Sequence, residues 1–306
     1  MEDEMMDWQA NVQRYLEFCE FMKKLDWNTL KAYRIDLRQF QDHLGGEEIG
    51  KEQLERYITS LHKQYKQKTV KRKIASLRAF FGYLEEEGVI EVSPMRQIRT
   101  KFKEEKVLPR IIPRKDIECL LNSMYRELSI REEGNLLRDI SIVEIFFSTG
   151  ARVYEVSNIK LENIDLKSGT ICFMGKGGKE RYVQIGEETV LKLLKRYYEM
   201  NEEKIKASGY FFTNQRGGRY TEQSIRGMLR KYTERAGISH KITPHMFRHS
   251  FATYLIEEGV DISCVQQILG HSSIKTTQIY IYVAAKRQAD ILRQCHPRKK
   301  MRIIAA

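Results

Sequence analysis

The sequence predicts a mostly α-helical protein with a small β-sheet, and three observations support this fold class. Apolar residues recur at steps of three and four over long stretches, as expected for amphipathic helices. Glycine follows several of these stretches, where it favours the left-handed turn that ends a helix. Only the short segments 169–174 and 181–185 have the pattern of strands, and the glycine-rich sequence GKGGKE between them predicts a hairpin.

The bulk composition indicates a basic globular protein. Its 306 residues are enough for two domains, and 42% hydrophobic with 31% charged residues argues against a disordered chain. The 53 Lys and Arg exceed the 41 Asp and Glu, and the net charge of +12 favours a polyanionic partner. No apolar run is long enough to cross a membrane, so we expect nucleic acid rather than a membrane as the partner. A merely basic, well-solvated surface is the alternative.

The cysteines and the N-terminus predict a cytoplasmic location. The five cysteines occur singly and form no CxxC pair, which indicates neither a zinc knuckle nor a disulfide framework. The first ten residues, MEDEMMDWQA, are acidic and lack the apolar segment of a signal peptide.

The N-terminal part, from about residue 7 to 87, is predicted to be helical. One helix carries five apolar residues at helical spacing and is expected to be capped by Asn28: Leu30, Tyr33, Leu37, Phe40 and Leu44. A later helix has the same pattern in Val70, Ile74, Leu77, Phe81 and Leu84. Its outer positions are basic, with no acid among them, and predict phosphate contacts by Lys66, Lys68, Lys71, Arg72, Lys73 and Arg78. A solvated face is the alternative for these six.

The stretch 93–116 predicts a linker between two domains. It holds three of the five prolines and has weak periodicity. We assign a first domain to residues 1–100, a linker to 101–113 and a second domain to 114–306. In the second domain, an apolar helix over 140–148 is expected to end near Gly150. Further helices are expected around 187–205, 221–236, 244–258 and 261–269.

The sequence TPHMFRHSF, residues 243–251, predicts a phosphate site at a helix N-terminus. Thr243 is a good N-cap, and Pro244 suits the first helical position. His245 and Arg248 lie three residues apart on one face of the first turns, where unpaired backbone N–H groups favour an anion. His245 and His249 have the spacing of a zinc pair, but the sequence between them lacks the catalytic glutamate of zinc proteases. We therefore expect no metal, and His249 reads as a packed or capping residue.

Four further positions carry candidate catalytic side chains. Arg152 follows the helix-ending glycine, and Glu155, three residues on, is expected to orient it. Lys176 lies at the hairpin tip, where a long ammonium side chain can reach a leaving group. His271 follows Gly270, and Tyr280 lies beyond it. Each of these residues alone is weak evidence for catalysis, so the prediction depends on the ordered set of Arg, Lys, His-x-x-Arg, His and Tyr.

This ordered set resembles the tyrosine recombinase (phage integrase) superfamily, most closely its Xer-like or transposon-resolvase branch. Four motifs within about residues 114–290 carry the resemblance: TGARVYEV, GKGGKER, TPHMFRHSFAT and LGHSSIKTTQIY. The sequence NTLKAYRIDLRQF is a weaker match to the helical core-binding domain of the family. The resemblance implies a SAM-like, DNA-binding core-binding domain in residues 1–100 and a mixed α/β catalytic domain in residues 114–306.

The resemblance also implies roles for single residues. Arg152 and Arg248 would clamp the non-bridging phosphate oxygens, and Lys176 would act as the general acid. His245 and His271 would add hydrogen-bond donors. Tyr280 would be the nucleophile, although Tyr282 stands where many relatives have a histidine. No cofactor is implied, because these cations replace the charge neutralisation that a metal supplies in other enzymes.

The implied activity is site-specific recombination of double-stranded DNA through a 3′-phosphotyrosyl intermediate. The partners would be a specific core site and a homotetramer on synapsed DNA, with or without a second recombinase. The segment Val283–Cys295 is the candidate for a helix exchanged between subunits, or else for a helix folded back on its own domain. Topoisomerase-like cleavage and religation, and a non-catalytic DNA-binding regulator, are the alternatives. Integration, excision, resolution and inversion all remain open as biological roles.

Overall fold

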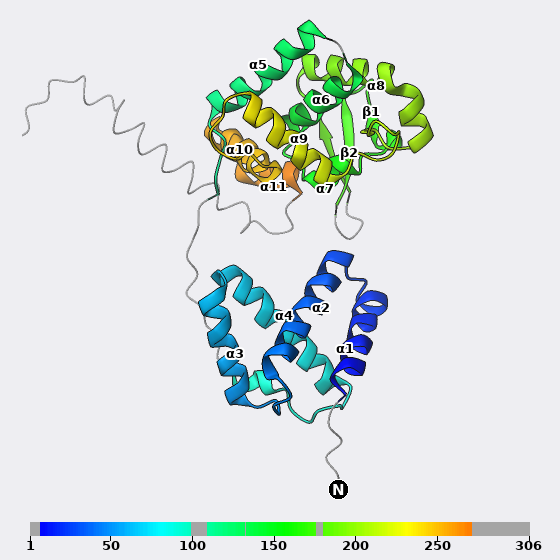
Figure 1. The fold of residues 1–306 in the computed structure, drawn as a ribbon. Helices are drawn as coiled ribbons and strands as arrows, with labels where there is room; N and C mark the ends of the chain where they lie inside the picture. The colour runs from blue at the N-terminus through cyan, green and yellow to red at the C-terminus, as the bar shows by residue number, and fades with distance from the viewer. Residues whose placement is uncertain (1–6, 99–108, 132, 176–179, 271–306) are drawn as a thin grey trace, which may run out of the picture. The chain divides into compact units, whose positions relative to one another are not determined.

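The computed structural model describes residues 7–98, 109–131, 133–175 and 180–270 (Figure 1). The chain divides into two compact units, residues 1–105 and 106–306, which we call the N-terminal and C-terminal units. None of the helices within the described ranges is long and apolar enough to cross a membrane.

The N-terminal unit is a bundle of four helices around an aromatic core. The helices are α1 (Trp8–Glu17), α2 (Trp27–Leu44), α3 (Lys51–Gln64) and α4 (Gln67–Glu86); a π-helical turn, η1 (Phe18–Met22), continues α1. The apolar residues predicted for the second and fourth helices pack into this core, and only Tyr33 among them is partly buried. The Trp8 ring lies 5.0 Å from the Phe80 ring, edge to face, so α1 is held against α4.

Asp26, and not Asn28, caps α2, so the predicted cap is wrong. Asp26 has an extended backbone, and its Oδ1 accepts a hydrogen bond from the backbone N–H of Thr29 at 3.0 Å. Asn28 already lies in the first helical turn. Both residue types are good caps, and the full negative charge of Asp26 suits the positive end of the helix better.

The predicted linker over residues 93–116 is too long, because residues at both ends of the stretch pack in the two units. Residues Pro94–Gln97 form a 3₁₀ turn (η2), and Met95 and Ile98 are buried in the core of the N-terminal unit. Ile112 is buried in the core of the C-terminal unit, and its backbone N–H donates to Ser250 Oγ at 2.7 Å. A high content of proline and charged residues is therefore found in these short, packed segments and does not by itself indicate a linker.

The C-terminal unit is built around α6 (Gly134–Thr149), which is buried on nearly every side. Helices α5 (Arg114–Ile130), α8 (Glu188–Ser208), α9 (Glu222–Arg235) and α10 (Pro244–Glu257) pack against it (Figure 1). The short helices α7 (Val153–Ser157) and α11 (Ile262–Leu269) follow α6 and α10 along the chain. The predicted helices are confirmed, with ends displaced by a few residues except for α6, which begins six residues earlier than expected.

A three-stranded antiparallel sheet completes the unit, in the order β1 (Ile164–Asp165), β2 (Thr170–Met174), β3 (Glu180–Gln184). A 3₁₀ turn, η3 (Leu161–Asn163), precedes it. Met174 pairs with Glu180, so the predicted hairpin is confirmed. The strand β1 was not predicted, because two residues carry no periodicity. Strand β2 contacts α7 and β3 contacts α11, which brings the sheet to the helix ends that carry the candidate site.

Candidate active site

Arg152 lies between the end of α6 and the start of α7. Gly150 ends α6 in a left-handed turn with φ of 59°, and Arg152 is the N-cap residue of α7. The backbone N–H of Arg152 donates to Glu155 Oε2 at 2.8 Å, and its Nη1 donates to Oε1 at 2.7 Å. Glu155 thus fixes the direction of the Arg152 side chain, through the contact that the three-residue spacing predicts.

Glu155 is buried and binds a second arginine, which the sequence did not single out. Arg181 on β3 donates from Nη2 to Glu155 Oε2 at 2.7 Å. Burial pushes the pKa of Glu155 upward, but hydrogen bonds from Arg181 and Arg152 outweigh it and hold this pKa below its ordinary value. The carboxylate is therefore ionised at neutral pH and acts as an anionic anchor for two guanidinium groups.

Arg248 is held by the C-terminal ends of two helices. Its Nη1 donates to the carbonyl of Gly150 at 2.8 Å, and its Nη2 donates to the carbonyl of Leu269 at 2.7 Å. Each carbonyl lies at the end of a helix, where the backbone dipoles favour a cation. The side chain is buried, with 4% exposed. Because Gly150 precedes Arg152 by two residues, Arg248 is anchored next to the segment that carries Arg152.

His245 lies on the surface beside this point, in the first turn of α10. Thr243 caps the helix, with its side chain accepting from the N–H of Met246, and Pro244 takes the first position, as predicted. His249, one turn on, is half-buried. Burial, followed by the nearby His245 and Arg248, lowers the pKa of His249 to about 4, so it is neutral at physiological pH.

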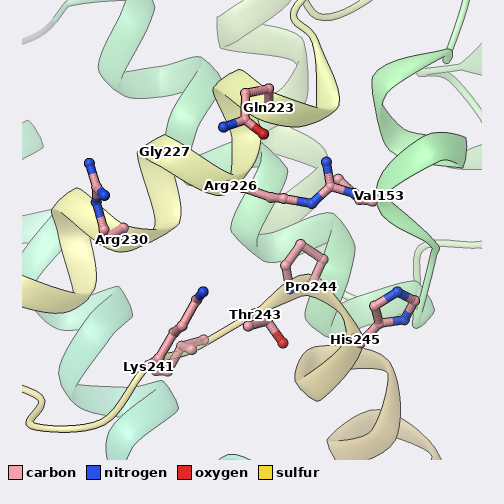
Figure 2. Close-up of a pocket in the computed structure, with 10 residues that line it drawn as sticks. Val153, Gln223, Arg226, Gly227, Arg230, Lys241, Thr243, Pro244 and His245 are labelled. Atoms are coloured by element: carbon pink, nitrogen blue, oxygen red, sulfur yellow. The ribbon is translucent and has the colours of Figure 1, made fainter. Parts of the chain in front are cut away.

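A basic pocket of about 460 Å³ opens next to His245 (Figure 2). One wall is α9, and the others are the start of α7 and the segment that leads into α10. Figure 2 shows Arg226 extending from α9 toward Val153, the residue after Arg152. The polar side chains around the pocket are Gln223, Arg226, Arg230, Lys241, Thr243 and His245. Such a surface suits a polyanion, and sequence reasoning missed α9 because the helix carries acidic as well as basic residues.

Three predicted catalytic residues, Lys176, His271 and Tyr280, lie outside the described residues, as does Tyr282. The neighbouring segments are described. Met174 and Glu180 flank the hairpin sequence that contains Lys176, and α11 ends at Leu269, two residues before His271.

The six basic residues predicted to contact DNA do not share one environment. Lys66, Lys68, Arg72 and Arg78 are exposed, and Lys71 is half-buried. Lys73 is buried, with 2% exposed, and its Nζ donates to Asp36 Oδ1 at 2.9 Å and to Gln39. Its predicted place on the outer face is wrong, because Asp36 of α2 draws the ammonium group inward.

The functional candidates that the sequence analysis missed are Arg181 and the pocket residues Gln223, Arg226, Arg230 and Lys241. Alternate residues of a strand face the same side of the sheet, so Arg181 in β3 faces the same side as Val183, which is buried. This alternation alone would have placed the arginine inward, where a charged side chain needs an anionic partner. That partner, Glu155, had been identified for Arg152 alone.

Comparisons with known proteins show the family of the chain. The phage integrase family matches residues 112–287, and the phage integrase N-terminal SAM-like domain matches residues 12–88. A tyrosine recombinase of Agathobacter rectalis is 44% identical over 302 residues, covering 96% of this chain and 99% of its own. A tyrosine recombinase XerD of Listeria innocua is 36% identical, covering 94% and 98%. The fold resembles that of the XerH site-specific recombinase in a post-cleavage complex with a palindromic difH substrate (TM-score 0.75, 23% identity, 92% and 85% covered). Because these matches span both units, the chain belongs to the phage integrase family, as an Xer-like tyrosine recombinase that cuts and rejoins DNA at specific sites.

Proposed function

We propose that this recombinase cuts DNA with the hydroxyl of Tyr280. The tyrosine oxygen attacks a backbone phosphorus, forms a 3′-phosphotyrosyl link and displaces the 5′ oxygen of the next nucleotide. A tyrosine hydroxyl, with an ordinary pKa of about 10, must lose its proton, and His245 or His271 accepts it. Lys176 protonates the leaving 5′ oxygen. One phosphate ester replaces another, so rejoining reverses the step without ATP.

The placement of Arg152, Arg248 and His245 beside the end of α6 supports this mechanism most strongly. Arg248 binds the Gly150 carbonyl, and His245 lines the same pocket as Val153, so two segments far apart in the chain converge on the end of α6. Two guanidinium forks suit the two non-bridging oxygens of a phosphate. Removing one such preorganised donor typically costs about 2.7–4 kcal/mol of barrier.

The basic pocket extends the proposed DNA contact beyond the scissile phosphate. Arg226, Arg230 and Lys241 would take neighbouring phosphates of the strand that His245 engages. In the N-terminal unit, the exposed basic residues of α4 and of its N-cap would form a second contact region: Lys66, Lys68, Arg72 and Arg78. The half-buried Lys71 remains a candidate for the rim of that region.

We further propose that the active assembly is a homotetramer on two synapsed core sites. The segment Val283–Cys295 would be the helix that each subunit passes to a neighbour, through apolar residues such as Ile291 and Leu292. The domains would divide as residues 1–100 for core binding, 101–113 as a linker whose Ile112 packs in the catalytic core, and 114–306 for catalysis. Native mass spectrometry of the protein on a cleaved duplex would give four copies, and truncation before Val283 would reduce this number.

Nucleophile identity is tested by trapping the covalent intermediate. Nicked duplexes tiled from the DNA that flanks the gene would be incubated with wild type, Tyr280→Phe and Tyr282→Phe, and covalent adducts resolved on SDS gels. We expect adducts with wild type and Tyr282→Phe, and none with Tyr280→Phe, which keeps its affinity for DNA because it lacks only a hydroxyl.

Adduct lost only in Tyr282→Phe would keep the enzyme class and change the nucleophile. Tight, specific binding without adduct from any of the three proteins would favour a non-catalytic regulator. Adducts whose products only relax supercoiled DNA, without exchange between two duplexes, would favour a topoisomerase-like activity.

A further inference from the structure

Arg181 joins three parts of the C-terminal unit. Its Nη2 donates to Glu155 Oε2 on α7 at 2.7 Å, and its Nη1 donates to the carbonyl of Ile268 in the last turn of α11. The guanidinium also lies 4.7 Å from the centroid of the Phe173 ring, its cross-strand partner on β2. The side chain is only 10% exposed, so water competes little for these contacts.

Two of these contacts lead directly to residues of the proposed mechanism. The other oxygen of Glu155 binds Arg152 Nη1, so a shift of Arg181 would be passed to Arg152 through one carboxylate. Ile268 lies three residues before His271. Arg181 and Arg248 also hold adjacent carbonyls, Ile268 and Leu269, so two arginines from different elements fix the end of α11.

Gly270 allows this close approach. Its φ of 64° lies in the left-handed region, and a Cβ atom at this position would lie 2.7 Å from Arg181 Cδ. Nε of Arg181, 3.5 Å from that same point, is buried and has no acceptor among the described residues. Buried donors are usually paired in folded proteins, so the two Nη groups carry all the hydrogen bonds that Arg181 makes to the described residues.

We propose that Arg181 is a positioning residue that holds the hairpin, Glu155 with its bound Arg152, and the end of α11 in one fixed arrangement. The inference rests on the proposed cleavage mechanism and goes beyond it, because Arg181 is assigned no contact with DNA. The role needs a planar fork that serves a carboxylate and a carbonyl on two different elements. A lysine at this position can reach only one of them at a time.

The test separates positioning from folding, DNA binding and acid catalysis. We would compare wild type, Arg181→Met, Arg181→Lys and the matched control Arg235→Met, whose arginine makes a half-exposed pair with Glu127 between α9 and α5. The probe is the nicked duplex that traps wild type. The measurements are its Kd by gel shift, the thermal midpoint, and the single-turnover rate of adduct formation.

We expect both Arg181 variants to bind DNA within about twofold of wild type and to form adducts about 10²-fold more slowly, the usual effect of a small misplacement of catalytic groups. Arg235→Met should match wild type. A 5′-bridging phosphorothiolate, whose leaving group needs no proton, should rescue Lys176→Ala but leave Arg181→Met slow, because Arg152 and the α11 end stay misplaced.

Each other result counts against the inference. Wild-type rates in Arg181→Met, or rates fully restored in Arg181→Lys, would show that the double contact is unnecessary. Full rescue by the phosphorothiolate would reduce the role of Arg181 to support of Lys176. A loss of rate matched by a loss of DNA affinity, or by unfolding of the variant at the assay temperature, would indicate a purely structural role. Wild type that forms no adduct would overturn the proposed mechanism as well, whereas the other results leave it standing.

Discussion

Asp36 is a buried carboxylate that three side chains of α4 satisfy together. Lys73 donates to its Oδ1 at 2.9 Å, Ser76 donates to its Oδ2 at 2.8 Å, and Arg72 pairs with Oδ2. Asp36 is 1% exposed and Lys73 is 2% exposed, so both charged groups are almost fully shielded from solvent. Such a pair adds little net stability when it is intact, but the loss of one partner strands the other charge.

Asp36→Asn should therefore lower the free energy of unfolding of the N-terminal unit by about 3 kcal/mol, because Lys73 stays buried without its counter-charge. The measurement is urea denaturation of the full chain followed by tryptophan fluorescence. The chain has only two tryptophans, Trp8 and Trp27, and both lie in this unit, so the signal reports on it alone.

The matched control is Lys51→Met, which removes the exposed pair that Lys51 makes with Glu55 at 3.9 Å. Exposed pairs contribute about 0–1 kcal/mol, so this variant should unfold close to wild type. Similar midpoints for Asp36→Asn and the control would mean that water reaches Lys73 and that the buried pair is unimportant.

The ends of α6 and α11 form the framework of the site at the level of secondary structure. Both helices end at a glycine in the left-handed region, Gly150 and Gly270. At each of these helix ends a backbone carbonyl accepts a hydrogen bond from Arg248: that of Gly150 at the end of α6 and that of Leu269 at the end of α11. The helix ends are thus fixed partly by a guanidinium group and partly by the glycines.

Gly150→Ala should be more destabilising than its backbone strain alone explains. The left-handed conformation costs a non-glycine residue about 1–2 kcal/mol. In addition, the new Cβ would lie 2.5 Å from Phe251 Cδ1 and 2.8 Å from Leu269 Cδ2, an overpacking that typically costs about 1–3 kcal/mol more. The measurement is urea denaturation followed by far-UV circular dichroism.

Gly209→Ala is the comparison for the strain alone. Gly209 ends α8 with φ of 72°, and among the described residues no atom lies within 4 Å of the point that its Cβ would occupy. If Gly150→Ala lowers the free energy of unfolding no more than Gly209→Ala does, then α10 and α11 can shift to accommodate the new Cβ and do not hold the end of α6 firmly.

Across the whole chain, the sequence predicts local features better than contacts between distant segments. Helical periodicity located the long helices, and the spacing of Arg152 and Glu155 predicted their contact, since both depend on neighbours in the chain. Position 73 lies at a helical step from the core residues Val70 and Leu77, so Lys73 had to face inward. Its partner Asp36 comes from another helix, and no local pattern links the two.

The same limit explains the missed pocket and the missed contact of Arg181. Arg226, Lys241 and His245 become neighbours only when α9 and the start of α10 pack together. The alternation of side chains along β3 could have predicted that Arg181 faces inward. Its second acceptor, the carbonyl of Ile268, is a backbone group, and no pattern in the sequence indicates it. Tertiary packing alone creates such a site.

The net charge of +12 and the basic pocket make DNA affinity dependent on salt. If Lys241 contacts a phosphate, Lys241→Gln should flatten the plot of log K against log salt concentration by about 0.9 units of slope. The control is Lys192→Gln on α8, where Lys192 pairs with Glu188 on the surface. Equal slopes for both variants would exclude Lys241 from the DNA interface.

The hold of Arg181 and Arg248 on α11 also bears on how the protein folds. Eight residues are too few for a helix to form alone in water. The last carbonyls of α11 obtain their hydrogen bonds from arginines on β3 and α10, which are themselves placed only after the unit has packed. We therefore expect α11 to become ordered only together with the packing that places these two arginines. The chain can therefore leave α11 from a fixed point, in the direction of the proposed nucleophile, only in a molecule whose proposed phosphate-binding arginines are already in place.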